Sequence, residues 1–261
     1  MVWSQVRHWA KKQDVFEHLG PQIERMCISI KSTVTAAQLP TLNDNSGFAK
    51  IFGQVIDASE DERIGISEIL WEEGMRSLKE GICTGNAEIL RKACLARETL
   101  CADTVENRLR AIEMKRAIVA YVEEQVKQNA NTSQRLILAL DKRYLASALD
   151  AQNHFEDALI FYQQALEIYR EVKTQDDDDA AAALGGSGVA LYNLGRYQES
   201  ISTYKQALNI RQRIWGEKHH GVARCHYNIG VSFSKLGDYT SSLKFFENDL
   251  RITTKIAGMQ I

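Results

Sequence analysis

The stretch ALYNLGRYQESISTYKQAL, residues 190–208, decides the fold of this chain because its pattern occurs three times. A related copy, ALDAQNHFEDALIFYQQAL, begins 42 residues earlier at Ala148, and SFSKLGDYTSSLKFFENDL begins 42 residues later at Ser232. The copies agree in aromatic residues (Tyr162, Tyr204, Phe246), in small residues (Ala158, Ser200, Ser242) and in a late leucine (Leu166, Leu208, Leu250). Internal repeats of this length are typical of arrays in which each unit stacks on its neighbour.

Each copy predicts two helices joined by a short turn. After the turn, apolar residues recur at helical spacing, as in Phe155, Leu159, Tyr162 and Leu166. The turn itself carries Asn153, Gly195 and Gly237. Asparagine and glycine adopt the left-handed conformation that ends many helices more readily than other residues do. The sequence therefore predicts antiparallel helical hairpins.

The repeats resemble a known family. The pattern N-I-G-x-x-F-x-x-x-G-D-Y-x-x-S (228–242) is similar to the tetratricopeptide repeat, and so is L-G-R-Y-x-x-S-x-x-x-Y-x-x-A-L (194–208). The usual period of that family is 34 residues, and the extra residues here fall between units, as in 210–230. The longer unit, with its Gly-x-x-His loop, resembles the repeats of kinesin light chains. The resemblance covers residues 138–257 and implies an all-α, right-handed solenoid of helical hairpins.

The chain is predicted to have three regions: a helical N-terminal segment (1–62), a second helical region (63–130) and three repeats of period 42 (131–261). In the second region, Trp71 and Ala87 have the spacing of signature residues of the family, so residues 64–101 are a possible divergent repeat. One long helix over residues 104–129 would then be a spacer or an N-terminal cap for the array.

The glycine-rich segment LGGSGVALYNLGRY (184–197) raises the alternative of a phosphate-binding loop. Such a loop needs a lysine and a hydroxyl residue directly after its last glycine, at the start of a helix that follows a strand. The segment has neither, and Gly188 aligns with Gly230 at the position where the second helix of a repeat packs. Gly185 and Gly186 are expected to mark a soft or late-starting first helix in the middle unit.

The composition is ordinary for a soluble globular protein. The net charge of −2 over 261 residues gives no reason to expect nucleic acid or a membrane surface as a partner. Five cysteines without a CxxC pair argue against a disulfide framework and a zinc site, so we expect reduced thiols and a cytoplasmic location. We also expect no signal peptide and no membrane span.

No residues in the sequence predict catalysis, a cofactor or a metal ion. The run QDDDDA (175–180) is expected to be a solvated loop whose last aspartates favour the start of the next helix. His219 is expected to help close the loop before the third unit. Cys225 and His226 are adjacent on a helix and point about 100° apart, so they cannot act as a nucleophile and its base. We therefore expect a protein that is not an enzyme.

The family resemblance implies a concave groove, lined by the first helix of each hairpin, in which partner peptides lie. The residues that align with groove positions are Arg143, Ser147, Asp150, Val189, Tyr192, Asn193, Arg224, Tyr227, Val231 and Lys235. The basic residues among them and the two tyrosines suit an acidic peptide with aromatic side chains.

The function we expect is that of a non-enzymatic scaffold or adaptor that binds a peptide segment of another protein. The alternative is a regulatory or sensor module whose repeats control an output of the N-terminal region or of a larger assembly. Self-association through uncovered terminal faces of the array is a further possibility. At the end of the array, Asp249 stands where earlier units carry Ala165 and Ala207, which slightly favours a polar cap there.

Overall fold

A computed structural model describes residues 59–79, 88–101, 103–129, 131–172 and 177–258 of the chain. Every regular element in these ranges is an α-helix, which confirms the all-α fold. The chain divides into two compact units, Met1–Asn107 and Arg108–Ile261, which are described separately. The expected helical segment 1–62 lies almost wholly outside the described residues, and the three region boundaries stay predictions.

The first unit contains a pair of packed helices, α4 (Glu60–Lys79) and α5 (Glu88–Leu100). Trp71 of α4 is buried, as are Leu90 and Cys94 of α5. Arg97 is only 5% exposed, and its guanidinium donates to Glu68 Oε1 at 3.1 Å and to Ser67 Oγ at 3.3 Å. Because a buried arginine needs such partners, these bonds tie α5 to α4. The divergent repeat expected over residues 64–101 stays a prediction.

The long helix predicted over residues 104–129 is present as α6 (Val105–Asn129). From Arg108 onward it belongs to the second unit, where Arg116 pairs with Asp157 at 3.0 Å. Lys142, which is 5% exposed, pairs with Glu123 of α6. These contacts place α6 against the first hairpin of the array, as expected of a helix that caps it.

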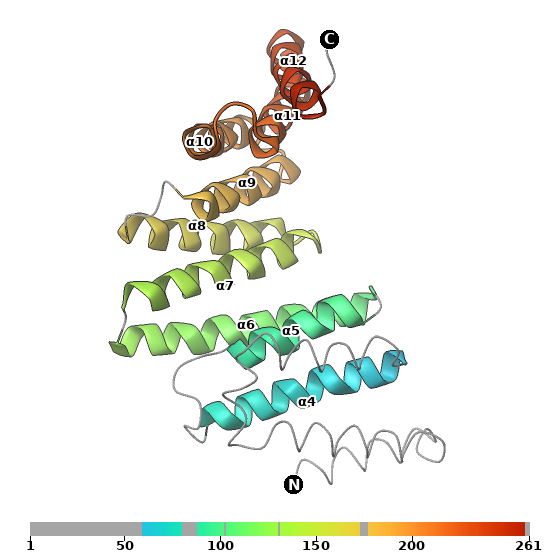
Figure 1. Ribbon diagram of the computed structural model, residues 1–261, viewed down its shortest axis with the longest axis vertical. Helices are drawn as coiled ribbons and strands as arrows, with labels where there is room; N and C mark the ends of the chain where they lie inside the picture. The colour runs from blue at the N-terminus through green and yellow to red at the C-terminus, as the bar shows by residue number, and fades with distance from the viewer. Residues whose placement is uncertain (1–58, 80–87, 102, 130, 173–176, 259–261) are drawn as a thin grey trace. The chain divides into compact units, whose positions relative to one another are not determined.

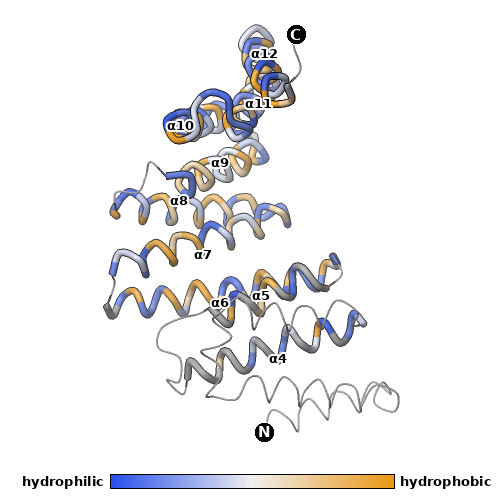
Figure 2. Tube along the Cα trace, viewed as in Figure 1, coloured by the Kyte–Doolittle hydropathy of each residue, from blue (hydrophilic) through white to orange (hydrophobic). Residues whose placement is uncertain are grey.

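Six further helices form the three hairpins and follow one another along the second unit (Figure 1). They are α7 (Thr132–Asp150), α8 (Phe155–Glu171), α9 (Asp178–Asn193), α10 (Tyr197–Trp215), α11 (His220–Lys235) and α12 (Tyr239–Ile256). Each contacts the next in chain order. Apolar and polar residues alternate along them (Figure 2), as expected of helices that bury one stripe.

The three predicted turns share one backbone conformation. Asn153, Gly195 and Gly237 have φ values of 64°, 76° and 80°, the left-handed region that the sequence predicted for these positions. In each turn the amide of the residue after the left-handed position closes the loop. His154 N–H donates to the Leu149 carbonyl, Arg196 N–H to the Leu191 carbonyl and Asp238 N–H to the Phe233 carbonyl. The repeat of the sequence is therefore also a repeat of the backbone conformation.

The small position of each first helix is a close-packing site, as predicted. A Cβ on Gly188 would lie 2.6 Å from Tyr204 Cε1, and one on Gly230 would lie 2.8 Å from Phe246 Cε1. The neighbouring serine of the second helix bonds to the same glycine, Ser200 Oγ to the Gly188 carbonyl at 2.8 Å and Ser242 Oγ to the Gly230 carbonyl at 2.9 Å.

The expectation of a late-starting first helix in the middle unit is wrong, whereas its softness stays a prediction. The helix α9 runs without interruption from Asp178 to Asn193, through both Gly185 and Gly186. It begins at Asp178 because the Asp177 side chain accepts a hydrogen bond from Ala180 N–H at 2.9 Å and caps it. It has the same length and register as α11, which begins 42 residues later.

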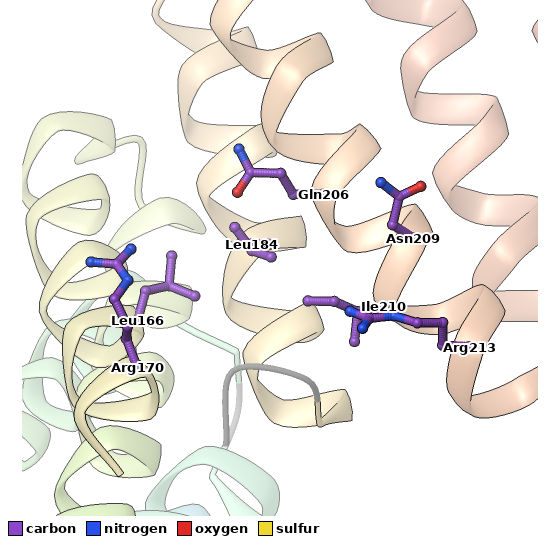
Figure 3. A pocket seen from close by; sticks show the side chains of 7 residues that line it. All are labelled: Leu166, Arg170, Leu184, Gln206, Asn209, Ile210 and Arg213. Carbon is purple, nitrogen blue, oxygen red and sulfur yellow. The ribbon is translucent and has the colours of Figure 1, made fainter. Parts of the chain in front are cut away.

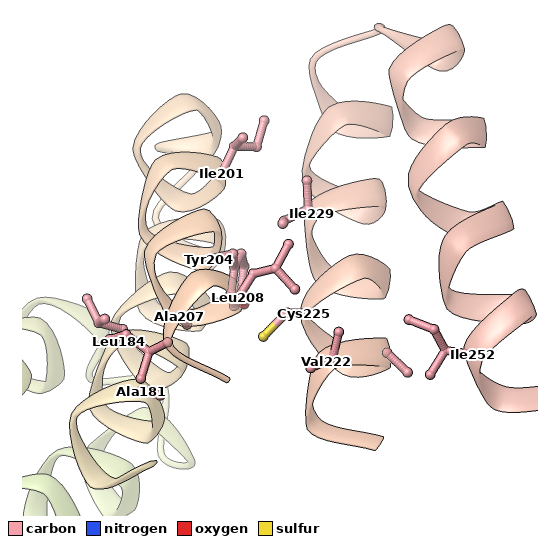
Figure 4. Close-up of a cluster of buried hydrophobic side chains, with 12 residues drawn as sticks. Ala181, Leu184, Ile201, Tyr204, Ala207, Leu208, Val222, Cys225, Ile229 and Ile252 are labelled. Atoms are coloured by element: carbon pink, nitrogen blue, oxygen red, sulfur yellow. The ribbon is translucent and has the colours of Figure 1, made fainter. Parts of the chain in front are cut away.

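The core of the array lies between successive hairpins. One buried cluster joins Leu184 of α9, Tyr204 and Leu208 of α10, and Cys225 and Ile229 of α11 (Figure 4). Burial of apolar side chains at about 25 cal/mol per Å² is the main force that holds such hairpins together. Each hairpin therefore depends on its neighbour for stability.

Candidate functional site

The residues predicted for the groove all lie on the first helices of the hairpins. Arg143, Ser147 and Asp150 are on α7, Val189, Tyr192 and Asn193 on α9, and Arg224, Tyr227, Val231 and Lys235 on α11. The side chains differ in burial, since Arg143, Asp150, Val189, Tyr192 and Val231 are half-buried whereas Ser147, Asn193, Arg224, Tyr227 and Lys235 are exposed. The structure brings two pairs of them together, Asp150 with Asn193 and Arg224 with Tyr227.

Asp150 and Asn193 form the first pair. The Asp150 carboxylate accepts a hydrogen bond from the Asn193 side chain, which links α7 to α9. Its other oxygen, Oδ1, is buried and has no hydrogen-bond partner within the described ranges. Burial raises the pKa of Asp150, and the bond from Asn193 opposes that rise only in part. Among the described residues, Asp150 is therefore a buried acceptor with one unsatisfied oxygen, and it links α7 to α9 through Asn193 alone.

Buried tyrosines of the second helices surround this carboxylate. The hydroxyl of Tyr162, from α8, is hydrogen-bonded to the Ser147 side chain, and burial raises its pKa to about 12. Burial also raises the pKa of Tyr204, on which the negative charge of Asp150 acts in the same direction. Both phenols therefore stay neutral at physiological pH and have a structural role in the packing of the hairpins.

Arg143 contributes less positive charge than its sequence position suggested. Its guanidinium pairs with Asp179 Oδ1 at 3.0 Å and lies over the Tyr144 ring, 4.5 Å from the ring centroid. The aspartate run that precedes α9 thus neutralises it. The basic character of the first helices is concentrated in α11.

Arg224 and Tyr227 form the second pair, at a pocket of the last hairpin. The pocket has a volume of about 290 Å³ and is lined by His220, Ala223, Arg224, Tyr227, Asp249, Thr253 and Ile256. Tyr227 is 51% exposed, and its ring packs against Phe246 with a centroid distance of 5.7 Å. An exposed aromatic ring held in place by a second ring offers a rigid apolar contact. Tyr192 is held similarly by Tyr197, at 5.4 Å.

The aspartates before α9 act as predicted at the start of a helix. Asp177 caps α9, and Asp178 accepts a hydrogen bond from Trp215 Nε1 at 3.3 Å and lies 3.6 Å from Arg211 Nε. The described residues contain no group of three or more histidine, cysteine or carboxylate side chains that could hold a metal ion. The part of the run at 175–176 lies outside the described residues.

His219 closes the loop before α11, as predicted. Its Nδ1 accepts a hydrogen bond from Gly221 N–H at 3.1 Å, and its ring stacks on Trp215 at 4.9 Å. Desolvation lowers the pKa of His219, and the neighbouring His220 lowers it further. The neutral imidazole is the form that can accept the capping bond.

A second pocket, which the sequence did not predict, lies between two second helices. The pocket is lined by Leu184 of α9, by Leu166 and Arg170 of α8, and by Gln206, Asn209, Ile210 and Arg213 of α10 (Figure 3). Its volume is about 380 Å³. Two guanidiniums stand at its rim and aliphatic side chains form its floor. No repeat signature marks these positions, because Arg170, Asn209 and Arg213 vary between the copies.

Comparison with known proteins agrees with the repeat pattern. Two sequence models of the tetratricopeptide repeat match the chain, one over residues 143–172 and one over residues 179–254. No curated protein sequence matches the chain. In the regions that the structure describes, no helix has both the length and the apolar character to cross a bilayer.

Solved structures share the fold. A kinesin light chain-like protein of Podosopora anserina with nearly identical TPR-like repeats superimposes with a TM-score of 0.58 at 15% identity, over 76% of this chain and 89% of that chain. BtubC (BKLC) from P. vanneervenii superimposes with a TM-score of 0.52 at 17% identity, over 78% of this chain and 95% of that chain. At these identities the likeness concerns the fold alone.

Proposed function

Because residues 143–254 are tetratricopeptide repeats that resemble those of kinesin light chains, we propose that this chain is a non-enzymatic cytoplasmic scaffold whose first helices bind a peptide segment of a partner protein. Tetratricopeptide repeats serve in general as protein-interaction scaffolds. The peptide lies along α7, α9 and α11, and its acidic and aromatic residues contact α11.

The pair of Arg224 and Tyr227 is the observation that carries this proposal. The Tyr227 ring is half exposed beside an apolar pocket, and Arg224 lies one helical turn before it on the same face of α11. Lys235 lies two turns further along α11. Within the described ranges, neither Arg224 nor Lys235 has a carboxylate partner in an ion pair. An aromatic side chain of the peptide would bury apolar area in the pocket, and a carboxylate would pair with Arg224.

The pair of Asp150 and Asn193 does not extend this recognition. The Asp150 Oδ1 atom, which has no partner within the described ranges, is buried, so a peptide on the surface of α7 and α9 does not reach it. The proposed peptide is therefore recognised through its acidic and aromatic residues at α11.

The test is a selection of peptides on the full chain from a display library, followed by fluorescence anisotropy with the selected peptides. We expect them to be rich in acidic and aromatic residues. The double variant Arg224→Glu, Tyr227→Ala is expected to weaken their binding at least about tenfold, which corresponds to 1.4 kcal/mol.

The matched control is Arg170→Glu with Ile160→Ala, which makes the same kinds of change on exposed positions of α8. The control is expected to bind like the wild type, and circular dichroism should show equal helix content for all three chains. Equal loss in both variants, or no loss in either, would remove the peptide site from α11.

A further inference from the structure

One apolar stripe recurs on every second helix of the array. In α8 it consists of Phe155, Leu159, Tyr162 and Leu166, in α10 of Tyr197, Ile201, Tyr204 and Leu208, and in α12 of Tyr239, Leu243, Phe246 and Leu250. The spacing of i, i+4, i+7 and i+11 places the four residues of each stripe on one face of the helix. The three faces are equivalent because each lies 42 residues from the next.

The first two stripes are covered by the first helix of the following hairpin. Leu159 packs with Ala190 and Leu191 of α9 and is 7% exposed. Ile201 and Leu208, in the same cluster as residues of α11 (Figure 4), are 2% and 7% exposed. Covering such a stripe is thus how this array joins one hairpin to the next.

Three of the four residues of the third stripe are exposed in the part of the chain that the structure describes. Leu243 is 60% exposed, Leu250 is 59% exposed and Tyr239 is 71% exposed, whereas Phe246 is half-buried against Tyr227 of its own hairpin. The polar cap that Asp249 suggested is therefore not what this face provides. Exposed apolar residues that gather on one helix face mark an interaction surface.

The two covering helices show what kind of occupant the stripe accepts. On α11 the residues at i, i+3, i+7 and i+11 are Val222, Cys225, Ile229 and Phe233, and on α9 they are Ala180, Ala183, Ser187 and Leu191. All are buried except Phe233, which is half-buried and packs against the cluster. The occupant therefore presents small or medium residues at the first three positions and a large apolar residue at the fourth.

A second copy of this chain does not offer such a helix within the described ranges. The stripes of α9 and α11 are buried in their own array. The equivalent residues of α7, Leu138, Asp141, Leu145 and Leu149, are also buried. A helix from a different protein fits the surface better than a second copy does.

We propose that the uncovered stripe of α12 binds an amphipathic α-helix of a partner protein, which takes the place that α11 takes on α10. This site is separate from the peptide site on the first helices, because neither Leu243 nor Leu250 lines the pocket at Tyr227.

The probe for this proposal is a hydrocarbon-stapled peptide with the sequence of residues 218–236, in which Cys225→Ala prevents oxidation. Fluorescence anisotropy measures its binding to the full chain. The double variant Leu243→Lys, Leu250→Lys is expected to weaken binding at least about tenfold. The control Ile160→Lys changes a 50%-exposed residue of α8 in the same way and is expected to leave binding unchanged.

Three outcomes would overturn the proposal: no binding to the wild type, equal binding by the wild type and the double lysine variant, or a concentration-dependent doubling of mass that this variant abolishes. The last would assign the stripe to a second copy of the chain. The double variant changes only exposed side chains, and its helix content is checked by circular dichroism. Because it leaves Arg224 and Tyr227 intact, failure here is distinguishable from failure of the peptide site.

Discussion

The ring of Tyr162, on α8, occupies the space beside Gly186 of α9 in which any other residue would place its Cβ. The equivalent rings of the next hairpins, Tyr204 and Phe246, instead fill the space beside the glycine of their own first helix, Gly188 and Gly230. Ala146 occupies that position in the first hairpin. Gly186 therefore serves the contact between hairpins, whereas Gly188 serves the contact within one.

This relationship predicts opposite effects for two adjacent glycines. Gly186→Ala forces the buried Tyr162 ring to move and is expected to lower the free energy of unfolding by about 1–3 kcal/mol, as overpacking does. Gly185→Ala adds a methyl group where nothing lies within 4 Å. It is expected to raise the free energy of unfolding by about 1 kcal/mol, because alanine favours a helix over glycine. Urea denaturation of both variants gives the comparison, and a loss of stability in Gly185→Ala would contradict it.

The ion pair between the buried Lys142 and the partly exposed Glu123 predicts an asymmetry between its two partners. The Lys142 ammonium also contacts Gln164 Oε1 at 2.5 Å and lies in a nearly solvent-free position. Glu123→Ala leaves that charge buried without its carboxylate and is expected to cost about 2–3 kcal/mol of stability. Lys142→Met keeps the aliphatic stem packed and removes the charge, so its expected cost is below about 1.5 kcal/mol. Thermal unfolding of the two variants measures the difference, and a larger loss in Lys142→Met would show that the pair itself stabilises the array.

His226 predicts a loss of stability in acid. Burial lowers its pKa below the usual 6.5, and the nearby Arg251 lowers it further. Because the folded state binds the proton more weakly than the unfolded state, the full stability is present above pH 6.5 and is lost as the pH falls through the folded pKa. The melting temperature of the wild type should therefore fall between pH 7.5 and pH 5. His226→Leu, which introduces the residue found at the equivalent position 184, is expected to fall less over the same range. A parallel fall in both would place the acid sensitivity elsewhere.

The raised pKa of Asp150 predicts the opposite pH dependence from that of His226, a contribution to stability that is lost as the pH rises. Burial raises its pKa, so the folded state binds the proton more tightly than the unfolded state does. This carboxyl therefore favours folding most at pH values below its unfolded pKa, and the advantage is lost as the pH rises through the folded pKa. Asp150→Asn keeps an acceptor for Asn193 and removes the charge. It is expected to melt at a higher temperature than the wild type at pH 7.5, and the difference should shrink at pH 4. A lower melting temperature at pH 7.5 would contradict the assignment.

The sequence by itself determined the repeat, its period and its turns. Spacing sets which residues share a face of a helix, and the left-handed turn positions accept few residue types, so Asn153, Gly195 and Gly237 could be identified without a structure. The same spacing placed every predicted groove residue on a first helix. These properties are local, because they depend only on residues that are close together in the sequence.

Only the tertiary structure decided which of those residues are available to a partner. Arg143 appeared as a groove cation, but Asp179, 36 residues away, neutralises it. The glycine at 186 appeared to weaken a helix, but a ring from the preceding hairpin requires it. The leucines of α12 match apolar residues of α8 and α10 that are buried or half-buried, yet they are exposed because no hairpin in the described part of the chain follows them. Each outcome depends on contacts with residues of another hairpin. The periodicity of one hairpin predicts which of its residues share a face, but it does not predict those contacts.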